Sequence, residues 1–401
     1  MATSGNAVRV GAAVVSGGLL VGAASYAVAA GSEEHRSGNA LERQWSARSE
    51  GQQVLGGERV PGVPSVQRLQ HDDVTFTVTV APARPGPNLV RVDSTHDHGV
   101  STGSTTAGPP VLVGTDEDDL VRAVPRPGTD GLWAVVDLPP GSGTVLVTHG
   151  RQHRLPFAVD TGTDRPDTAT WIGPEGPECL TAASATLLAG GVVPTGCPAD
   201  ALHTADAEAL RAMVGSLVDR GIEEIAVEYD DSPRSRAALD LVRSAATEAG
   251  VAVVTPDDPP GARNALVVVS GWGTAARHLA EVTGRPLREQ PIRSDGTWLA
   301  PWLLTPGVVD STAGAVLALD FDIRDTAAQE FSQVLAEYFP GQAPTGSAYL
   351  AWRAARGGDP DPLTLYAASR AAYMPASSGH HETTVAWFPG GTVTPVGALA
   401  R

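Results

Sequence analysis

Residues 222–280 constrain the fold of this chain most strongly, because they contain two strands joined by a well-marked helix. Residues 225–229 form a short and largely apolar run, as expected for a buried strand. Ser232 and Pro233 then mark a helix start, since serine caps free backbone N–H groups and proline favours the first helical position. Apolar residues recur at helical spacing up to a glycine, and residues 251–255 form the next strand. This order predicts a right-handed, parallel βαβ sheet and an α/β fold.

The carboxyl ends of these strands are the predicted ligand-binding edge. Residues 266–270 add a third strand, and a helix is expected over about residues 274–283. In parallel sheets, ligands bind beyond the carboxyl ends of the strands. The candidate ligand-binding residues at this edge are Asp230, Ser232, Ser270 and Trp272.

Two interpretations of this edge are open. Backbone N–H groups of residues 270–273 precede a helix and are expected to hold a carboxylate or another anion. Trp272, Trp298 and Trp302 would then form an apolar wall for a small ligand. In the alternative, the turn residues cap the sheet and the tryptophans fill the core.

Three motifs in residues 165–375 are found together: the turn Asp-Asp-Ser-Pro before the helix, the strand end Val-Val-Val-Ser, and FSQVLAEYFPGQAPTGSAYLAWRAAR at 331–356. In these motifs the segment resembles the second lobe of type 1 periplasmic solute-binding proteins, the family of the branched-chain amino-acid receptors. The resemblance implies non-catalytic binding of a small polar solute. Residues 167–221 have room for about two helices and one strand, whereas a complete first lobe needs several βα units. A reduced solute-binding domain is therefore expected.

The N-terminus indicates export. Residues 10–30 are an uncharged run rich in Ala, Val, Gly and Leu. Their length suits an N-terminal hydrophobic helix that spans a membrane, while Ala27-Val28-Ala29 fits a signal-peptidase site. Residues 1–31 are thus a retained anchor or a cleaved signal, and residues 32–70, rich in polar residues and Gly, are predicted to be a flexible linker.

Residues 71–160 are predicted to form an N-terminal antiparallel β-sandwich, and residues 165–401 the α/β domain. Six or so short strands are separated by Gly and Pro turns. The segments TFTVTVAPARPGPNLVRV and GLWAVVDLPPGSGTVLVTHG resemble the immunoglobulin-like domains of extracytoplasmic copper-handling proteins. His96 and His98 are candidate ligands for copper or zinc. The alternative is a solvated loop.

The two cysteines of the chain, Cys179 and Cys197, lie close together in sequence. In an exported protein such a pair predicts a structural disulfide. Two independent buried thiols are the alternative.

Composition excludes several functions. The formal net charge is −17, which argues against a nucleic-acid partner. All of the 28 basic residues are arginines, so lysine Schiff-base chemistry and a phosphate-loop lysine are excluded. His-Glu-x-x-His does not occur, and the serine in the run Val-Ser-Gly-Trp-Gly at 269–273 lacks the glycine that a Gly-x-Ser-x-Gly motif places two residues before it. The chain is therefore not expected to be an enzyme. Arginine in place of lysine and abundant alanine suggest an actinobacterial source.

The function predicted from the sequence is non-catalytic binding in the cell envelope by an exported, membrane-tethered protein. Its partner would be a small polar solute or a membrane protein, and no cofactor is expected unless copper binds. Copper handling and a scaffold role in a membrane complex are the two alternatives.

Overall fold

The computed structural model describes most of the chain from residue 53 onward. The described residues are 53–55, 59–71, 74–96, 110–149, 153–165, 167–193, 196–339, 342–370, 387–388 and 391–399. The apolar run at residues 10–30 lies outside them. Among the helices that are described, none is long and apolar enough to cross a membrane.

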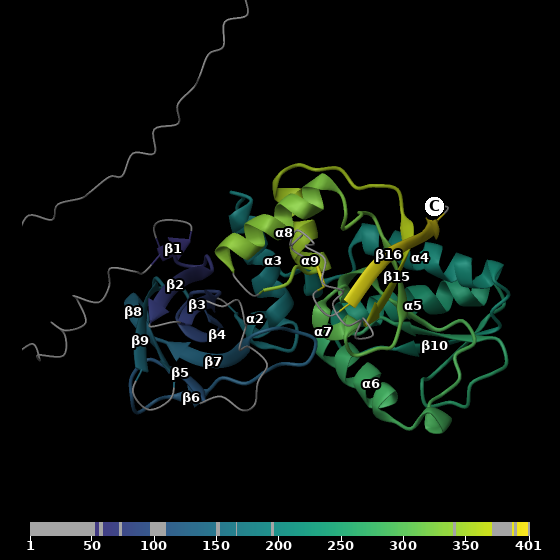
Figure 1. Cartoon of the computed structure of the whole chain (residues 1–401), viewed down its shortest axis with the longest axis horizontal. Helices are drawn as coiled ribbons and strands as arrows, with labels where there is room; N and C mark the ends of the chain where they lie inside the picture. Colours follow the sequence, from purple (N-terminus) through teal and green to yellow (C-terminus); the bar gives the residue numbers. More distant parts are fainter. Residues whose placement is uncertain are drawn as a thin grey trace, which may run out of the picture. The chain divides into compact units, whose positions relative to one another are not determined.

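A seven-stranded sheet forms the centre of the larger part of the molecule (Figure 1). Its strand order is β11-β10-β12-β13-β14-β15-β16. The first five are parallel, namely β10 (Glu224–Glu228), β11 (Ala252–Val254), β12 (Asn264–Val268), β13 (Thr297–Leu299) and β14 (Ala315–Leu319). The last two, β15 (Thr364–Arg370) and β16 (Gly391–Ala398), are antiparallel. The predicted parallel βαβ sheet is confirmed, and β16 brings the C-terminal segment back to one edge of the sheet.

Helix α5 (Pro233–Glu248) begins and ends where the sequence predicts. Ser232 is the N-cap, and its side chain accepts the Ser235 N–H. Gly250 ends the turn after the helix with a φ of +73°, a conformation that favours glycine. Residues four apart, Arg234, Ala238, Val242 and Ala246, are buried. One face of α5 therefore packs on the sheet.

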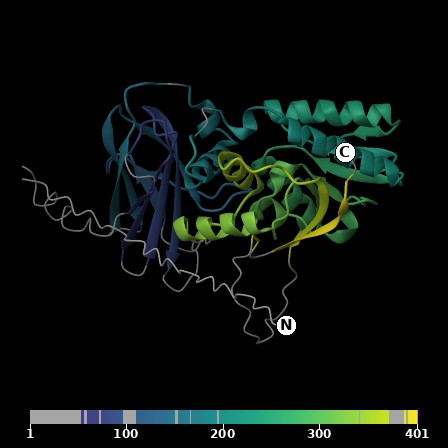
Figure 2. The same cartoon turned by 90° about the horizontal axis from the view of Figure 1, so that it is seen from above.

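The helices lie on both faces of the sheet. The β10-α5-β11 and β12-α6-β13 crossovers run in opposite directions across the strand order, so right-handed connections place α5 and α6 (Trp272–Gly284) on opposite faces. Helix α4 (Thr204–Asp219) runs beside α5, and both are drawn in teal in Figure 2. The sheet is buried on both sides, as parallel sheets are.

Three further helices lie near the carboxyl ends of β13 and β14. Helix α3 (Gly176–Leu188) packs against α9 (Gly346–Ala355), and α9 also contacts α8 (Thr326–Tyr338). Rings of Phe331, Tyr349 and Trp352 from α8 and α9 lie with centroids 5.7–6.1 Å apart. This aromatic contact fixes α9. The shorter helical turns are α2 (Ala169–Ile172), α7 (Pro306–Val309), η2 (Pro198–Asp200), η3 (Leu287–Glu289) and η4 (Pro301–Leu303).

Two antiparallel sheets precede this part. One has the order β1-β2-β3-β4-β7, formed by Gln53–Leu55, Ser65–His71, Val74–Ala81, Gly86–His96 and Leu132–Leu138. The other has the order β6-β5-β8-β9, formed by Val121–Arg122, Val111–Gly114, Ser142–His149 and His153–Asp160. Phe76, Val78, Val147 and Phe157 belong to one hydrophobic core that includes residues of both sheets.

Strand β2 corrects the predicted extent of the flexible linker. Residues 65–70 were expected in the linker, but Ser65–His71 pairs along its whole length with β3. The segment has polar residues at most positions, so alternation of apolar residues does not mark it as a strand. Its buried Gln67 side chain donates to the Ala158 carbonyl of β9 instead. A polar contact thus takes the place of an apolar one.

Trp171 and Ile172 lie in a short helix, although one strand was expected between residues 167 and 221. These residues lie in α2, whose first turn starts where the Asp167 carboxylate accepts the Ala169 N–H at 2.9 Å. An Asp side chain that binds a backbone N–H two residues on starts a turn. Between residues 167 and 221, the described residues form helices and no strand.

The loop at Gly128 joins the antiparallel sheets to the α/β part. Thr305 donates its hydroxyl to the Gly128 carbonyl at 3.0 Å. A Cβ at Gly128 would lie 2.5 Å from the Trp272 carbonyl oxygen, and its φ is +81°. Leu89 and Trp133 of the antiparallel strands share a core with Cys179 and Leu180 of α3.

Candidate ligand-binding site

The four residues proposed as ligand-binding surround one turn, and the Asp230 carboxylate binds Ser232 and the backbone of that turn. Asp230 follows β10, and one of its carboxylate oxygens accepts the N–H and the hydroxyl of Ser232 at 3.0 and 2.7 Å. The other accepts the Gly271 N–H at 2.7 Å. The turn at residues 270–273 was expected to hold an anion, and the chain itself supplies that carboxylate.

Ser270 and Trp272 are buried beneath this turn. Trp272 donates its indole N–H to the Trp302 carbonyl at 2.7 Å. Trp302 donates its own to the Ser270 carbonyl at 2.9 Å. The two indoles therefore tie the end of β12 to the end of β13.

Glu175 covers the same turn from the other side. A Cβ on Gly271 would lie only 1.9 Å from a Glu175 carboxylate oxygen, so the two residues are in close contact. Burial, the neighbouring Glu178 and Asp230 raise the pKa of Glu175 to about 7, against the opposing effect of Arg234. The point between β10 and β12 where the strand order reverses is thus covered by carboxylates of the chain itself.

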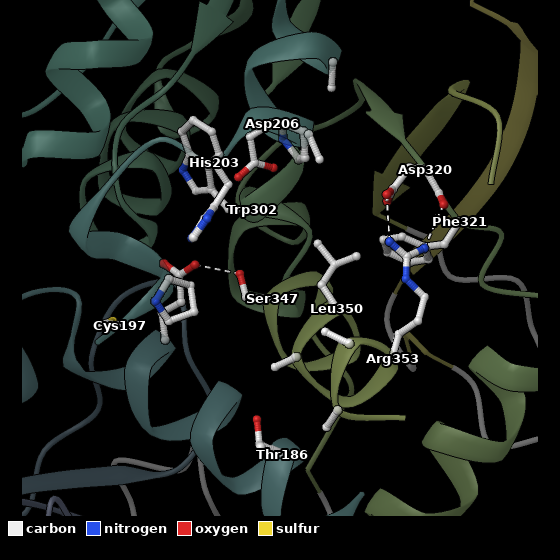
Figure 3. A pocket seen from close by; sticks show the side chains of 18 of the residues that line it. Thr186, Cys197, His203, Asp206, Trp302, Asp320, Phe321, Ser347, Leu350 and Arg353 are labelled. Carbon is white, nitrogen blue, oxygen red and sulfur yellow. Dashed lines mark hydrogen bonds and ion pairs between the residues drawn. The ribbon is translucent and has the colours of Figure 1, made fainter. Parts of the chain in front are cut away.

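A cavity of about 690 Å³ lies nearby, at the carboxyl ends of β13 and β14 (Figure 3). It lies at the carboxyl edge of the sheet, where ligand binding was predicted, but the predicted residues follow β10 and β12 rather than β13 and β14. Helices α3, α4, α5 and α9 contribute much of the remaining wall, together with residues 191–192 and 196–198 between α3 and α4. None of Asp230, Ser232, Ser270 and Trp272 is among its lining residues, whereas Trp302 is.

An ion pair forms one end of the cavity. Arg234, at the start of α5, donates to both carboxylate oxygens of Glu178 on α3 at 2.7 and 2.6 Å. Ser347 of α9 donates its hydroxyl to the same carboxylate at 2.6 Å. The guanidinium also lies 4.5 Å from the ring centroid of Trp302. Arg234 and Glu178 are 2% and 1% exposed, so this pair is fully desolvated.

A second ion pair forms the other end. Arg353 of α9 donates to the Asp320 carboxylate at 2.7 Å and to its carbonyl at 2.8 Å. Figure 3 shows Leu350 between this pair and Ser347. The apolar part of the lining comprises Pro301, Trp302, Phe321, Leu350, Ala351 and Leu363, among others.

Asp206 of α4 is a third acidic group in the cavity wall. Its carboxylate accepts no hydrogen bond from any residue that the structure describes. Burial and the negative charges of Glu178 and Asp320 raise its pKa to about 7, although Arg234 acts in the opposite direction. In Figure 3 the carboxylate faces the interior of the cavity.

The predicted disulfide between Cys179 and Cys197 is confirmed. It joins α3 to the segment that enters η2, and Cys197 lies in the cavity wall. The covalent link therefore holds two walls of the cavity together.

The proposed metal ligands cannot be placed together. His98 lies outside the described residues, and of His96 only the backbone, at the end of β4, is described. Among the side chains that are described, no group of three could hold a metal ion.

Sequence reasoning missed Arg234, Glu178, Asp206, Ser347 and Arg353. One signal was present, because Arg234 falls on the apolar face of α5 at the spacing of Ala238 and Val242. A charged residue at such a position needs a buried partner.

No protein-family model matches the chain, and no curated protein does. Among solved structures, an ABC transporter substrate-binding protein from Desulfitobacterium hafniense in complex with Leu is 15% identical, with 37% of this chain and 47% of that chain covered and a TM-score of 0.28. A branched chain amino acid ABC transporter periplasmic ligand-binding protein from Burkholderia xenovorans LB400 is 12% identical, with 57% and 80% covered and a TM-score of 0.33.

A solute-binding protein from Rhodopseudomonas palustris BisB5 in complex with 3,4-dihydroxy benzoic acid is 15% identical, with 48% and 65% covered and a TM-score of 0.33. The chain spans about half the length of the first of these structures. The function proposed below rests on the cavity and its charges.

Proposed function

We propose that this chain is an exported, non-catalytic binding protein that holds a small solute in the cavity at the carboxyl ends of β13 and β14. The observation that carries the proposal is the cavity itself, about 690 Å³ in volume, with an apolar middle between two ion pairs. Volumes of about 300–1,000 Å³ are typical of sites for small molecules.

The polar groups of the cavity are positioned before any ligand arrives. Arg234 is fixed by two hydrogen bonds to Glu178, and Arg353 by two to Asp320. A site built in this way loses little conformational entropy on binding. The geometry therefore favours a receptor whose cavity is largely formed in the free state.

The same contacts argue against catalysis at Ser347. Its hydroxyl donates to Glu178, as a nucleophile would donate to a base. However, both oxygens of Glu178 already accept from Arg234. The carboxylate is therefore held in a buried ion pair rather than free to act as a base. We therefore expect binding without turnover.

Export is supported by the disulfide, because disulfides persist mainly in oxidising compartments outside the cytosol. The apolar run at residues 10–30 would provide the signal or the membrane anchor. We further propose that the two antiparallel sheets form an immunoglobulin-like sandwich that accompanies the binding domain in the cell envelope. The common core of the two sheets supports this.

The test is thermal unfolding of the full chain with a panel of small solutes. A ligand that binds the native state raises the unfolding midpoint. Leu350→Trp would fill the cavity between its two ends, whereas Leu287→Trp, at a position that is 86% exposed, is the matched control. A shift seen in the chain and in Leu287→Trp but not in Leu350→Trp supports the proposal. A shift that survives Leu350→Trp contradicts it.

Copper handling through His96 and His98 stays a prediction. It is tested by the same unfolding experiment with copper, in the chain and in a variant with both histidines changed to alanine. If copper alone shifts the midpoint, and the double substitution abolishes the shift, the function lies with the antiparallel sheets. If no solute and no metal shifts it, a scaffold role or a protein partner becomes the better proposal.

A further inference from the structure

The charges in the cavity restrict the chemistry of its ligand, if solute binding there is accepted as proposed above. The lining residues carry three carboxylates, on Glu178, Asp206 and Asp320, and two guanidiniums, on Arg234 and Arg353. Each guanidinium is already paired with a carboxylate. One acidic group, Asp206, is left over.

A ligand carboxylate has no free partner among these groups. To reach Arg234 it would have to displace Glu178, which is held by two hydrogen bonds from the guanidinium and one from Ser347. To reach Arg353 it would have to displace Asp320. Removing a buried carboxylate from its partner leaves a desolvated charge and is unfavourable. The site therefore disfavours anions.

Asp206 has the opposite property. Its carboxylate faces the cavity, and no described residue donates a hydrogen bond to it. Burial, together with the charges of Glu178 and Asp320, raises the pKa of this group to about 7, and the opposing charge of Arg234 offsets this only in part. A protonated amine would supply a further positive charge and form a charge-assisted hydrogen bond. The net charge of −17 would also attract cations to the protein.

We infer that the cavity takes an organic cation, with a protonated amino group bound by Asp206 and an apolar body against Trp302, Phe321 and Leu350. The apolar residues lie between the two charged ends, so a ligand with one amine and one hydrophobic group matches the distribution of polarity. A ligand that carries a free carboxylate is selected against.

Three probes of the same shape test this inference: benzylammonium, benzyl alcohol and benzoate, titrated calorimetrically into the full chain. Benzylammonium is expected to bind at least about tenfold more tightly than the other two, as one charge-assisted hydrogen bond predicts. In Asp206→Asn this preference is expected to disappear. Glu208→Gln, on the exposed side of the same helix, is the matched control and retains it.

The pH dependence gives a second readout. Ionised Asp206 binds the cation, so the affinity for benzylammonium should rise as the pH increases through about 7. In Asp206→Asn the affinity should not depend on pH in this range. The other charged groups that line the cavity are Glu178, Asp320, Arg234 and Arg353, with His203 at the start of α4, and they are unchanged in that variant.

The outcomes separate this inference from the proposed function. Benzoate binding at least as tightly as benzylammonium, with both lost in Leu350→Trp, overturns the inference and leaves solute binding intact. Equal affinity of the chain and Asp206→Asn for benzylammonium also overturns it. Failure of all three probes to bind at millimolar concentration overturns it too, and the solute panel then decides the proposed function alone.

Discussion

Replacement of Arg234 by methionine is the sharpest test of the ion pair that closes the cavity. Methionine keeps much of the side-chain volume but leaves Glu178, which is 1% exposed, with the Ser347 hydroxyl as its one donor among the described side chains. Breaking a buried pair by removing one partner costs about 3–5 kcal/mol of unfolding free energy. The lost stacking of the guanidinium on Trp302, at 4.5 Å, adds to this loss.

The double variant Glu178→Met with Arg234→Met separates the charge from the packing. Replacing both partners by apolar residues of similar size is often close to neutral, because no buried charge is left unpaired. We therefore expect the double variant to regain most of the stability lost in Arg234→Met. Arg236→Met, which removes a solvent-exposed pair with Asp231, is the control and should cost far less than Arg234→Met.

The assay is urea unfolding followed by tryptophan fluorescence, with the free energies compared in a double-mutant cycle. A cost below about 1 kcal/mol for Arg234→Met would refute the reasoning, since it would mean that Glu178 is not left desolvated. Additive effects of the two substitutions would refute it as well.

Three further predictions concern stability. Folding raises the pKa of Glu175 from 4.5 to about 7, so the protonated carboxyl group stabilises the fold at low pH and this contribution is lost as the pH rises through 7. Compared with Glu175→Gln, the unfolding free energy of the chain should fall by about 2–3 kcal/mol between about pH 4.5 and pH 7.5. Urea titrations at several pH values measure this difference. A flat difference between the two proteins would contradict this. Reduction of the disulfide should lower the unfolding free energy by about 3 kcal/mol, because it closes a loop in the unfolded chain. An unchanged urea midpoint after complete reduction would show that the disulfide does not stabilise the fold. Gly128→Ala should lower the unfolding free energy by about 1–3 kcal/mol more than Gly141→Ala. Both glycines have positive φ, but a Cβ at residue 128 would clash with the Trp272 carbonyl, whereas one at residue 141 meets nothing. Equal losses would show that the loop is not held against Trp272.

The parallel sheet was predictable because its signals are local. Ser232, Pro233 and Gly250 mark the two ends of α5 within one short stretch, and the strands on either side are continuous apolar runs. Strand β2 was not predictable in this way, since its pairing depends on Gln67 and on a neighbouring strand rather than on alternating apolar residues.

The cavity was beyond prediction because its groups are distant in sequence. Arg234 binds a carboxylate 56 residues away, and Ser347 reaches the same carboxylate across 169 residues. The rule that ligands bind at the carboxyl edge of a parallel sheet selects the correct edge. It does not say which strands of that edge form the site. At the ends of β10 and β12, Asp230 and Glu175 cover the turn, whereas the cavity lies at the ends of β13 and β14.

Equilibrium dialysis of the full chain against a pooled extract of small metabolites, followed by mass spectrometry of the retained compounds, tests the central claim most directly. The account predicts that the chain and Leu287→Trp retain at least one solute, that it carries an amine, and that Leu350→Trp retains none. Retention of the same solute by Leu350→Trp would show that the cavity at the ends of β13 and β14 is not where this protein binds.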